Sequence, residues 1–126
     1  MPGVSLLRYD KNENPNYQYV VVEVEAAKSG LTRDELLAVL HAENVLARRY
    51  FYPGVHRMEP YSSFPEARMV LPETEAIASR VLVLPTGTGV TSADIEKVCA
   101  IIRLAIERGP EISKHFASAV ASAVAG

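Results

Sequence analysis

The sequence predicts a two-layer α+β domain in which helices pack on one face of a small mixed β-sheet. Short segments rich in β-branched residues, typical of strands, alternate with longer segments that carry apolar residues at helical spacing. The chain has 126 residues, of which 48% are hydrophobic and 22% charged. A chain of this size buries about two-thirds of its unfolded surface and can form one real core.

The first half of the sheet is predicted from residues 6–9 and 17–25. Segment 17–25 (YQYVVVEVE) gives the strongest strand signal, because it contains three consecutive valines. At its end valine alternates with glutamate, so one face there is expected to meet water. The polar segment 10–16 (DKNENPN) between the two strands is typical of a turn.

A helix is predicted at about 33–43. Thr32 and Glu35 have the spacing of a capping box at its start. Asn44 tolerates the left-handed conformation that ends a helix. Segment 45–52 is predicted to be the next strand. A helix that connects two strands acts as a crossover, which favours a parallel or a skip-one arrangement of those strands.

The second half is predicted to hold a loop, two helices and one strand. Segment 55–70 has no clear periodicity, and loops of this length are usually functional or disordered. Pro72 suits the first turn of a short helix that reaches about residue 80. Residues 81–84 (VLVL) form a buried strand, and Thr91 opens a long amphipathic helix that ends near residue 108.

We divide the chain into a folded domain, residues 1–109, and an Ala-rich helical tail, residues 110–126. Gly109 and Pro110 are expected to end the preceding helix. The tail then carries apolar residues at four-residue spacing, as in an amphipathic helix: Ile112, Phe116, Val120 and Val124.

Charge and composition exclude several classes of protein. Thirteen basic and fifteen acidic side chains give a net charge of −2. The chain therefore lacks the excess of basic residues that is typical of a nucleic-acid-binding protein. No apolar run approaches the roughly 18 residues of a membrane span, and the N-terminus lacks the pattern of a secretory signal. We therefore expect a soluble, cytoplasmic protein. A single cysteine, Cys99, excludes a multi-cysteine metal site, and no metal is expected.

The densest group of chemically capable residues is segment 48–61 (RRYFYPGVHRMEPY). It holds three arginines, three tyrosines, a phenylalanine and a histidine. Arginine forks match phosphate groups, and aromatic rings offer flat stacking faces. The segment would suit a phosphorylated, ring-bearing ligand. The alternative is a strand whose aromatic residues belong to the core and whose arginines are solvated.

Three segments, 16–25, 31–61 and 71–103, resemble in order and spacing the C-terminal part of the DegT/DnrJ/EryC1/StrS aminotransferases. The most specific parts are RRYFYP with the following histidine and PY, and the stretch LPETE at 71–75. The resemblance covers about residues 2–108. It implies the small domain of a fold-type-I, pyridoxal-phosphate enzyme, which closes over a nucleotide-linked keto sugar. At the substrate edge it implies five residues: Arg49, Tyr50, Tyr52, His56 and Tyr61.

The chemical centre of that family is not expected in this chain. Fold-type-I chemistry needs a Schiff-base lysine in the large domain, and none of the four lysines stands in the family's lysine motif: Lys11, Lys28, Lys97 and Lys114. We therefore expect no catalytic residue and no cofactor bound by this chain, although full-length members hold pyridoxal phosphate.

The resulting hypothesis is a detached or truncated substrate-closing domain that is not catalytic alone. Two alternatives remain open: a standalone binding or assembly module, or a half-enzyme completed by a separate large domain that binds pyridoxal phosphate. The expected partners are a second copy of the chain or such a large domain, together with weak binding of a nucleotide sugar.

Overall fold

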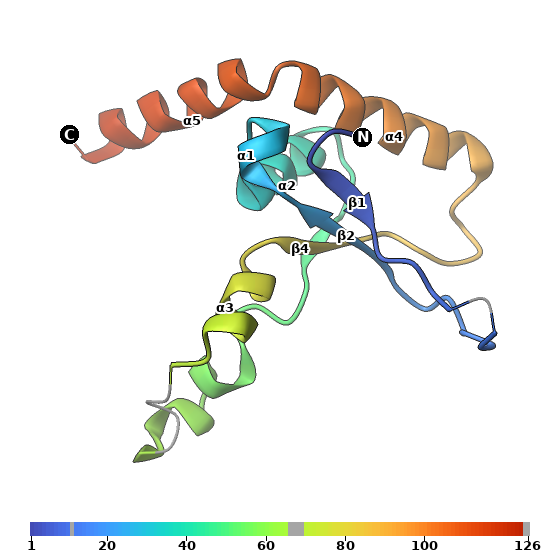
Figure 1. Ribbon diagram of the computed structural model, residues 1–126. Coiled ribbons are helices and arrows are strands. Elements are labelled where there is room, and N and C mark those ends of the chain that lie inside the picture. Colours follow the sequence, from blue (N-terminus) through green and yellow to red (C-terminus); the bar gives the residue numbers. More distant parts are fainter. Residues whose placement is uncertain (11, 66–69, 125–126) are drawn as a thin grey trace.

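The computed structural model describes residues 1–10, 12–65 and 70–124 (Figure 1). Its strands are β1 (Val4–Leu6), β2 (Val20–Val24), β3 (Arg48–Arg49) and β4 (Val81–Leu84). Its α-helices are α1 (Ala26–Ser29), α2 (Arg33–Ala42), α3 (Pro72–Ala78), α4 (Ser92–Glu107) and α5 (Gly109–Val124). Two short 3-10 helices, η1 (Val55–Arg57) and η2 (Tyr61–Ser63), lie between β3 and α3.

The strands form one sheet in the order β1-β2-β4-β3. The predicted two-layer α+β class is confirmed, but the expected mixed pairing is wrong, because all three strand pairs in the described chain are antiparallel. Strand β4 comes last in the sequence but lies between β2 and β3 in the sheet. Those two strands therefore run in the same direction with β4 between them, which is the skip-one arrangement.

The helices α2 and α4 cover one face of the sheet, as predicted. Val22 and Val24 of β2 and Leu82 of β4 point into this layer. They meet buried side chains from both helices, among them Leu36 of α2 and Ile102 of α4. This cluster is the main core. Because side chains in a strand alternate between faces, the valines between these positions point to the opposite face.

A second, smaller cluster lies on that opposite face. It consists of Val21, Val81 and Val83, with Tyr50 packed against them. Residues 81–83 are thus at most 9% exposed on either face of β4. This double burial explains why the strand reads VLVL without alternating polar residues.

Local signals in the sequence correctly predict three helix ends. Thr32 caps α2 and Thr91 caps α4, each in a complete capping box with the acidic residue three positions later. Asn44 has a φ of 58°, in the left-handed region, just after α2. These ends fix where the chain enters and leaves the helical layer.

The strand predicted at 45–52 is shortened to Arg48–Arg49. Before it, Ala47 is fully buried, and its carbonyl lies 2.7 Å from His41 Nε2 in a tight turn. After it, Phe51 has a φ of 45°, which ends the extended conformation. Strand β1 starts two residues earlier than predicted, and β2 is confined to Val20–Val24. Of the irregular segment 55–70, residues 66–69 lie outside the described residues.

Helix α5 follows α4 almost without interruption, with Gly109 and Pro110 in its first turn. The expectation that α4 ends at this pair is confirmed, because α4 stops at Glu107 and a separate helix starts at Gly109. A Cβ atom added at Gly109 would lie 2.5 Å from the Ser29 carbonyl oxygen. The corner between α4 and α5 thus rests directly on the backbone that joins α1 to α2, and only glycine permits this approach.

No helix in the described ranges is long and apolar enough to cross a membrane.

Candidate functional site

Arg49 and Tyr52 lie together at the β3 edge of the sheet. Arg49 pairs with Leu82 in register and therefore points toward the helical layer. Its Nε donates to Asp34 Oδ1 at 2.8 Å, and its guanidinium carbon lies 4.9 Å from the centre of the Tyr52 ring. The Arg49 side chain is 45% exposed and Tyr52 is 46% exposed. Both are therefore accessible to a ligand.

Arg33 completes this cluster, although it was not among the predicted site residues. The side chain is buried, with 1% of its surface exposed. Its Nε donates to Asp34 Oδ1 at 2.7 Å, and its Nη1 donates to the carbonyls of Ala78 and Val81 at 2.9 and 2.8 Å. Its guanidinium carbon also lies 4.9 Å from the Tyr52 ring centre. An arginine in the first turn of an amphipathic helix is ordinarily solvated, so no pattern distinguishes it.

Tyr50 lies on the other face of the sheet, away from Arg49. Strand alternation places it against Val21, Val81 and Val83. Its ring centre lies 5.5 Å from that of Tyr19 and 4.4 Å from that of Phe51. For Tyr50 the structure therefore favours the packing alternative over a ligand contact.

His56 and Tyr61 lie on the 3-10 segments that follow Tyr52. His56 Nε2 lies 3.2 Å from Glu75 Oε1, an oxygen that also accepts a 2.5 Å hydrogen bond from Arg57 Nη2. These hydrogen bonds from Arg57 and His56 hold the pKa of the Glu75 carboxyl below its usual value. They attach η1 to α3. Tyr61 opens η2 and is 51% exposed.

The predicted site is therefore divided by the fold. Arg49 and Tyr52 share one cluster with Arg33 and Asp34, which we call the arginine–tyrosine cluster. His56 belongs to the contact between η1 and α3, Tyr61 lies on η2, and Tyr50 is part of the smaller core.

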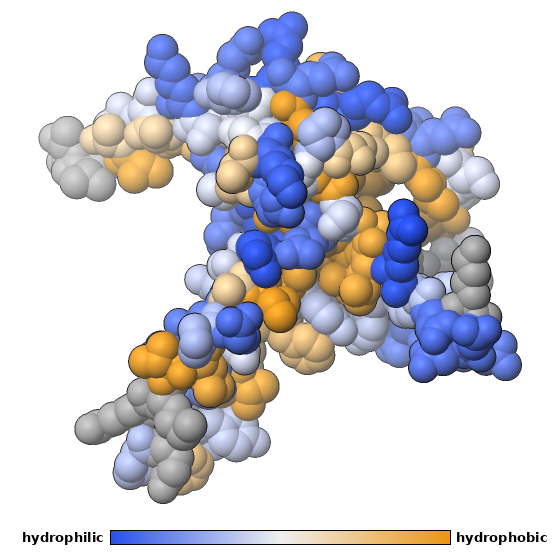
Figure 2. All heavy atoms as spheres, viewed as in Figure 1, coloured by the Kyte–Doolittle hydropathy of each residue, from blue (hydrophilic) through white to orange (hydrophobic). Residues whose placement is uncertain are grey.

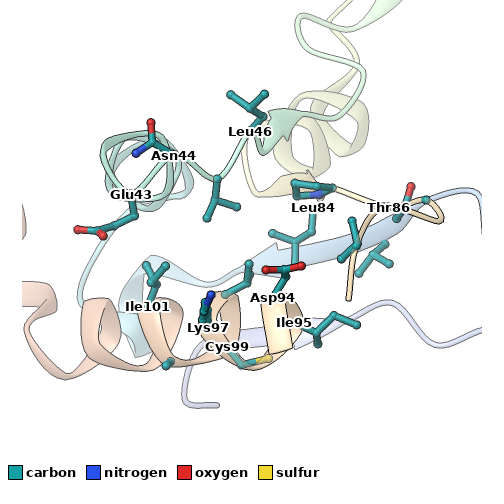
Figure 3. Close-up of a pocket in the computed structure, with 18 residues that line it drawn as sticks. Glu43, Asn44, Leu46, Leu84, Thr86, Asp94, Ile95, Lys97, Cys99 and Ile101 are labelled. Carbon is teal, nitrogen blue, oxygen red and sulfur yellow. The ribbon is translucent and has the colours of Figure 1, made fainter. Parts of the chain in front are cut away.

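A large apolar hollow lies between α4 and the end of the sheet (Figure 3). Its volume is about 970 Å³. Leu84 and the loop after β4 form one wall, the end of α2 and Leu46 form another, and the N-terminal half of α4 closes it. Leu46 is 77% exposed and Ile95 is 54% exposed. In the space-filling view, apolar side chains gather in the recess below the α4 end of the molecule (Figure 2).

The described residues do not fit a pyridoxal-phosphate site. Such a site needs an enclosed lysine, a carboxylate for the pyridine nitrogen and donors for the phosphate. Lys97 lines the hollow but is exposed on α4, and Lys28 pairs with Glu25 Oε2 at 2.7 Å on the surface. Asp94, near Lys97, accepts the N–H and hydroxyl of Thr91 as part of the helix cap. Lys11 lies outside the described residues.

This layout, a four-stranded antiparallel sheet with helices on one face and a cationic, aromatic cluster at its edge, defines a small α+β domain. The model of the DegT/DnrJ/EryC1/StrS aminotransferase family matches residues 1–103. The chain belongs to this family.

Two curated relatives are enzymes named dTDP-4-amino-4,6-dideoxy-D-glucose transaminase. The Escherichia coli enzyme is 28% identical over 102 residues, and the Shigella dysenteriae enzyme is 35% identical over 101 residues. Each match covers 80% of this chain but only 27% of the relative. The chain thus spans about a quarter of the length of these enzymes.

Solved structures give the same result. The crystal structure of DesI in the presence of its TDP-sugar product superposes with a TM-score of 0.82 and 43% identity, covering 91% of this chain and 29% of DesI. A DegT/DnrJ/EryC1/StrS aminotransferase from Brucella abortus superposes with a TM-score of 0.65 and 27% identity, covering 80% of this chain and 26% of that enzyme. The chain therefore has the fold of one part of these aminotransferases.

Proposed function

We propose that this chain acts as the substrate-closing small domain of a nucleotide-sugar aminotransferase and is not catalytic alone. The observation that carries the proposal is the arginine–tyrosine cluster. It presents an accessible guanidinium and an accessible aromatic ring side by side, on a fold shared with an enzyme solved with a TDP-sugar.

Each exposed member of the cluster has a part in this function. Arg49 supplies positive charge and hydrogen-bond donors for the diphosphate, and Tyr52 supplies a ring face and a hydroxyl. Tyr61, which is 51% exposed, extends the surface along the segment that follows. His56, whose side chain is 10% exposed, borders this surface and holds η1 to α3, and Tyr50 supports it from the opposite side of the sheet. The cofactor chemistry is supplied by a domain that the described residues do not contain.

The affinity of this surface alone is expected to be weak. Good pockets enclose roughly 70–90% of a ligand, whereas a sheet edge contacts one side only. A dissociation constant on the order of millimolar corresponds to about −4 kcal/mol.

A second candidate function, an assembly module, is favoured by the hollow. An accessible apolar recess of about 970 Å³ is typical of a surface that meets a partner. We propose a large cofactor-binding domain as this partner, which would make the chain one half of an enzyme. Self-association is the expected outcome when that domain is absent, with residues 110–126 acting as a helical tail beyond the domain of residues 1–109.

Reductive trapping tests whether the chain is catalytic alone. The purified protein is incubated with pyridoxal phosphate, reduced with borohydride and weighed by mass spectrometry. We expect no stoichiometric adduct beyond that of a surface-lysine control protein treated in the same way. A stoichiometric adduct that disappears in Lys97→Ala would contradict the proposal, because Lys97 is the described lysine that lines the hollow.

A further inference from the structure

We propose that Arg33 is a positioning residue for the ligand surface: it fixes the Tyr52 ring directly and the Arg49 guanidinium through Asp34. This inference rests on the proposed function, in which Arg49 and Tyr52 contact the nucleotide sugar. Arg33 itself is 1% exposed at its side chain and cannot be the contact.

The surroundings of Arg33 show why it is immobile. A buried guanidinium is costly unless it is paired and hydrogen-bonded. Here it has one carboxylate partner, Asp34, and two carbonyl partners, Ala78 and Val81. The two carbonyls belong to the end of α3 and the start of β4. Arg33 thus joins the start of α2 to the chain between α3 and β4, which is 45 to 48 positions away in sequence.

Tyr52 lies against both guanidinium groups of the cluster. The carbons of Arg33 and Arg49 are each 4.9 Å from its ring centre, within the range of cation–π contact. Two cations that contact the same ring repel each other, and an anion between them offsets this repulsion. Asp34 Oδ1 accepts from both, at 2.7 and 2.8 Å. The ring therefore lies against two guanidinium groups that share one carboxylate, while 46% of the tyrosine stays exposed.

The net charge of the cluster suits the binding of an anion. Two arginines and one aspartate leave one net positive charge. Because Arg33 has its hydrogen bonds inside the protein, the exposed Arg49 carries this charge at the surface. Ordering a long side chain before the ligand arrives removes part of the entropy cost of binding. The geometry therefore assigns to Arg33 the preorganisation of an anion-binding arginine.

The test uses the substitution Arg33→Lys, which keeps the charge but loses the planar fork. Arg80→Lys is the matched control, because Arg80 is 44% exposed and its ion pair with Glu23, at 3.3 Å, lies elsewhere. Two signals are read: the Nε–H resonance of Arg49 by NMR, and the dissociation constant for thymidine diphosphate.

In Arg33→Lys we expect the Arg49 Nε–H resonance to move toward that of a free arginine and the affinity to fall about tenfold, the size of a lost charged hydrogen bond. Arg80→Lys should change neither. If Arg33→Lys is folded and leaves the Arg49 resonance in place, the proposal is overturned. A wild type that does not bind thymidine diphosphate would refute the proposed function, while the Arg49 resonance would still decide the role of Arg33.

A measurement on the wild type covers the case in which Arg33→Lys does not fold. The 15N relaxation of the Arg49 Nε–H is compared with that of the Arg80 Nε–H, because the two side chains are 45% and 44% exposed. An Arg49 side chain that is more ordered than Arg80 supports the inference, and equal mobility of the two overturns it.

Discussion

At the scale of single residues, Tyr50 and Tyr52 show how two neighbouring tyrosines take opposite roles. Tyr50 follows the strand alternation and packs on Val21, Val81 and Val83. Phe51 then turns the chain with its positive φ, and Tyr52 reaches the side of Arg49. One tyrosine therefore contributes to stability and the other to the accessible surface.

Tyr50→Ala should lower the free energy of unfolding by about 1–3 kcal/mol, because it removes a ring that covers three buried valines. Phe64→Ala, which removes a 52% exposed ring, should lower it by less than about 1 kcal/mol. Urea denaturation measures both. Equal losses in the two variants would show that Tyr50 is not part of the smaller core.

The concentration of arginine and aromatic residues predicts segment 48–61 as the site, and the family resemblance selects Arg49 and Tyr52 within it. It cannot predict Arg33, since the partners that bury it are 45 and 48 positions away. It also cannot separate Tyr50 from Tyr52, because that depends on where the strand ends. Strand β3 ends because Phe51 has a positive φ, and no local motif in the sequence predicts this conformation.

At the scale of elements, the start of α2 connects the helical layer to α5. Glu35 Oε2 accepts the Thr32 N–H at 2.6 Å, and Oε1 accepts the Ser113 hydroxyl at 2.8 Å. Burial raises the pKa of Glu35, but these hydrogen bonds outweigh it and the pKa lies below the usual 4.5. The capping box was predictable from the sequence, whereas the bond to Ser113, 78 positions away, was not.

The Glu35 carboxylate should make the free energy of unfolding decrease at low pH. Because its pKa is lower in the folded chain than in the unfolded chain, it stabilises the fold above about pH 4.5, and this contribution is lost as the pH falls through the folded-state pKa. Glu35→Gln should therefore show a shallower loss of stability below pH 4.5 than the wild type. Urea unfolding at several pH values measures this, with the exposed Glu96→Gln as control. Parallel pH profiles for wild type and Glu35→Gln would refute it.

The corner between α4 and α5 gives a second test at this scale. Alanine at Gly109 gains about 1 kcal/mol of helix propensity but would place its Cβ 2.5 Å from the Ser29 carbonyl oxygen. Backbone must move, so we expect a net loss of about 1–3 kcal/mol. Gly89→Ala is the control, because its Cβ would have no neighbour within 4 Å. Thermal unfolding compares them. A Gly109→Ala protein as stable as the wild type would contradict the close contact.

At the scale of the whole molecule, the helical layer extends beyond the sheet at both ends (Figure 1). At one end α4 overhangs the apolar hollow, and at the other α5 leaves the domain with exposed residues from Ala117 to Ser122. The fold class and the order of the main strands and longer helices were predictable, because they follow from local periodicity, whereas the four-residue helix α1 and the wholly antiparallel pairing were not. The hollow could not be predicted from the sequence, because it depends on the distance between α4 and the end of the sheet.

The hollow should promote self-association of the purified chain. Ile95→Asp places a charge in its apolar wall and should reduce the average mass measured by light scattering at high protein concentration. Leu104→Asp is the control, since Leu104 is 59% exposed on the same helix but does not line the hollow. A wild type that is monomeric at all concentrations, or an equal effect of both variants, would show that the hollow is not the contact.

The most direct test of the central proposal is an NMR titration of the chain with a dTDP-sugar. We expect amide and side-chain shifts centred on Arg49 and Tyr52, saturating at millimolar ligand and lost in Arg49→Gln. Shifts confined to the hollow, or no shifts near the arginine–tyrosine cluster at saturating ligand, would contradict the assignment of this chain as a substrate-closing domain.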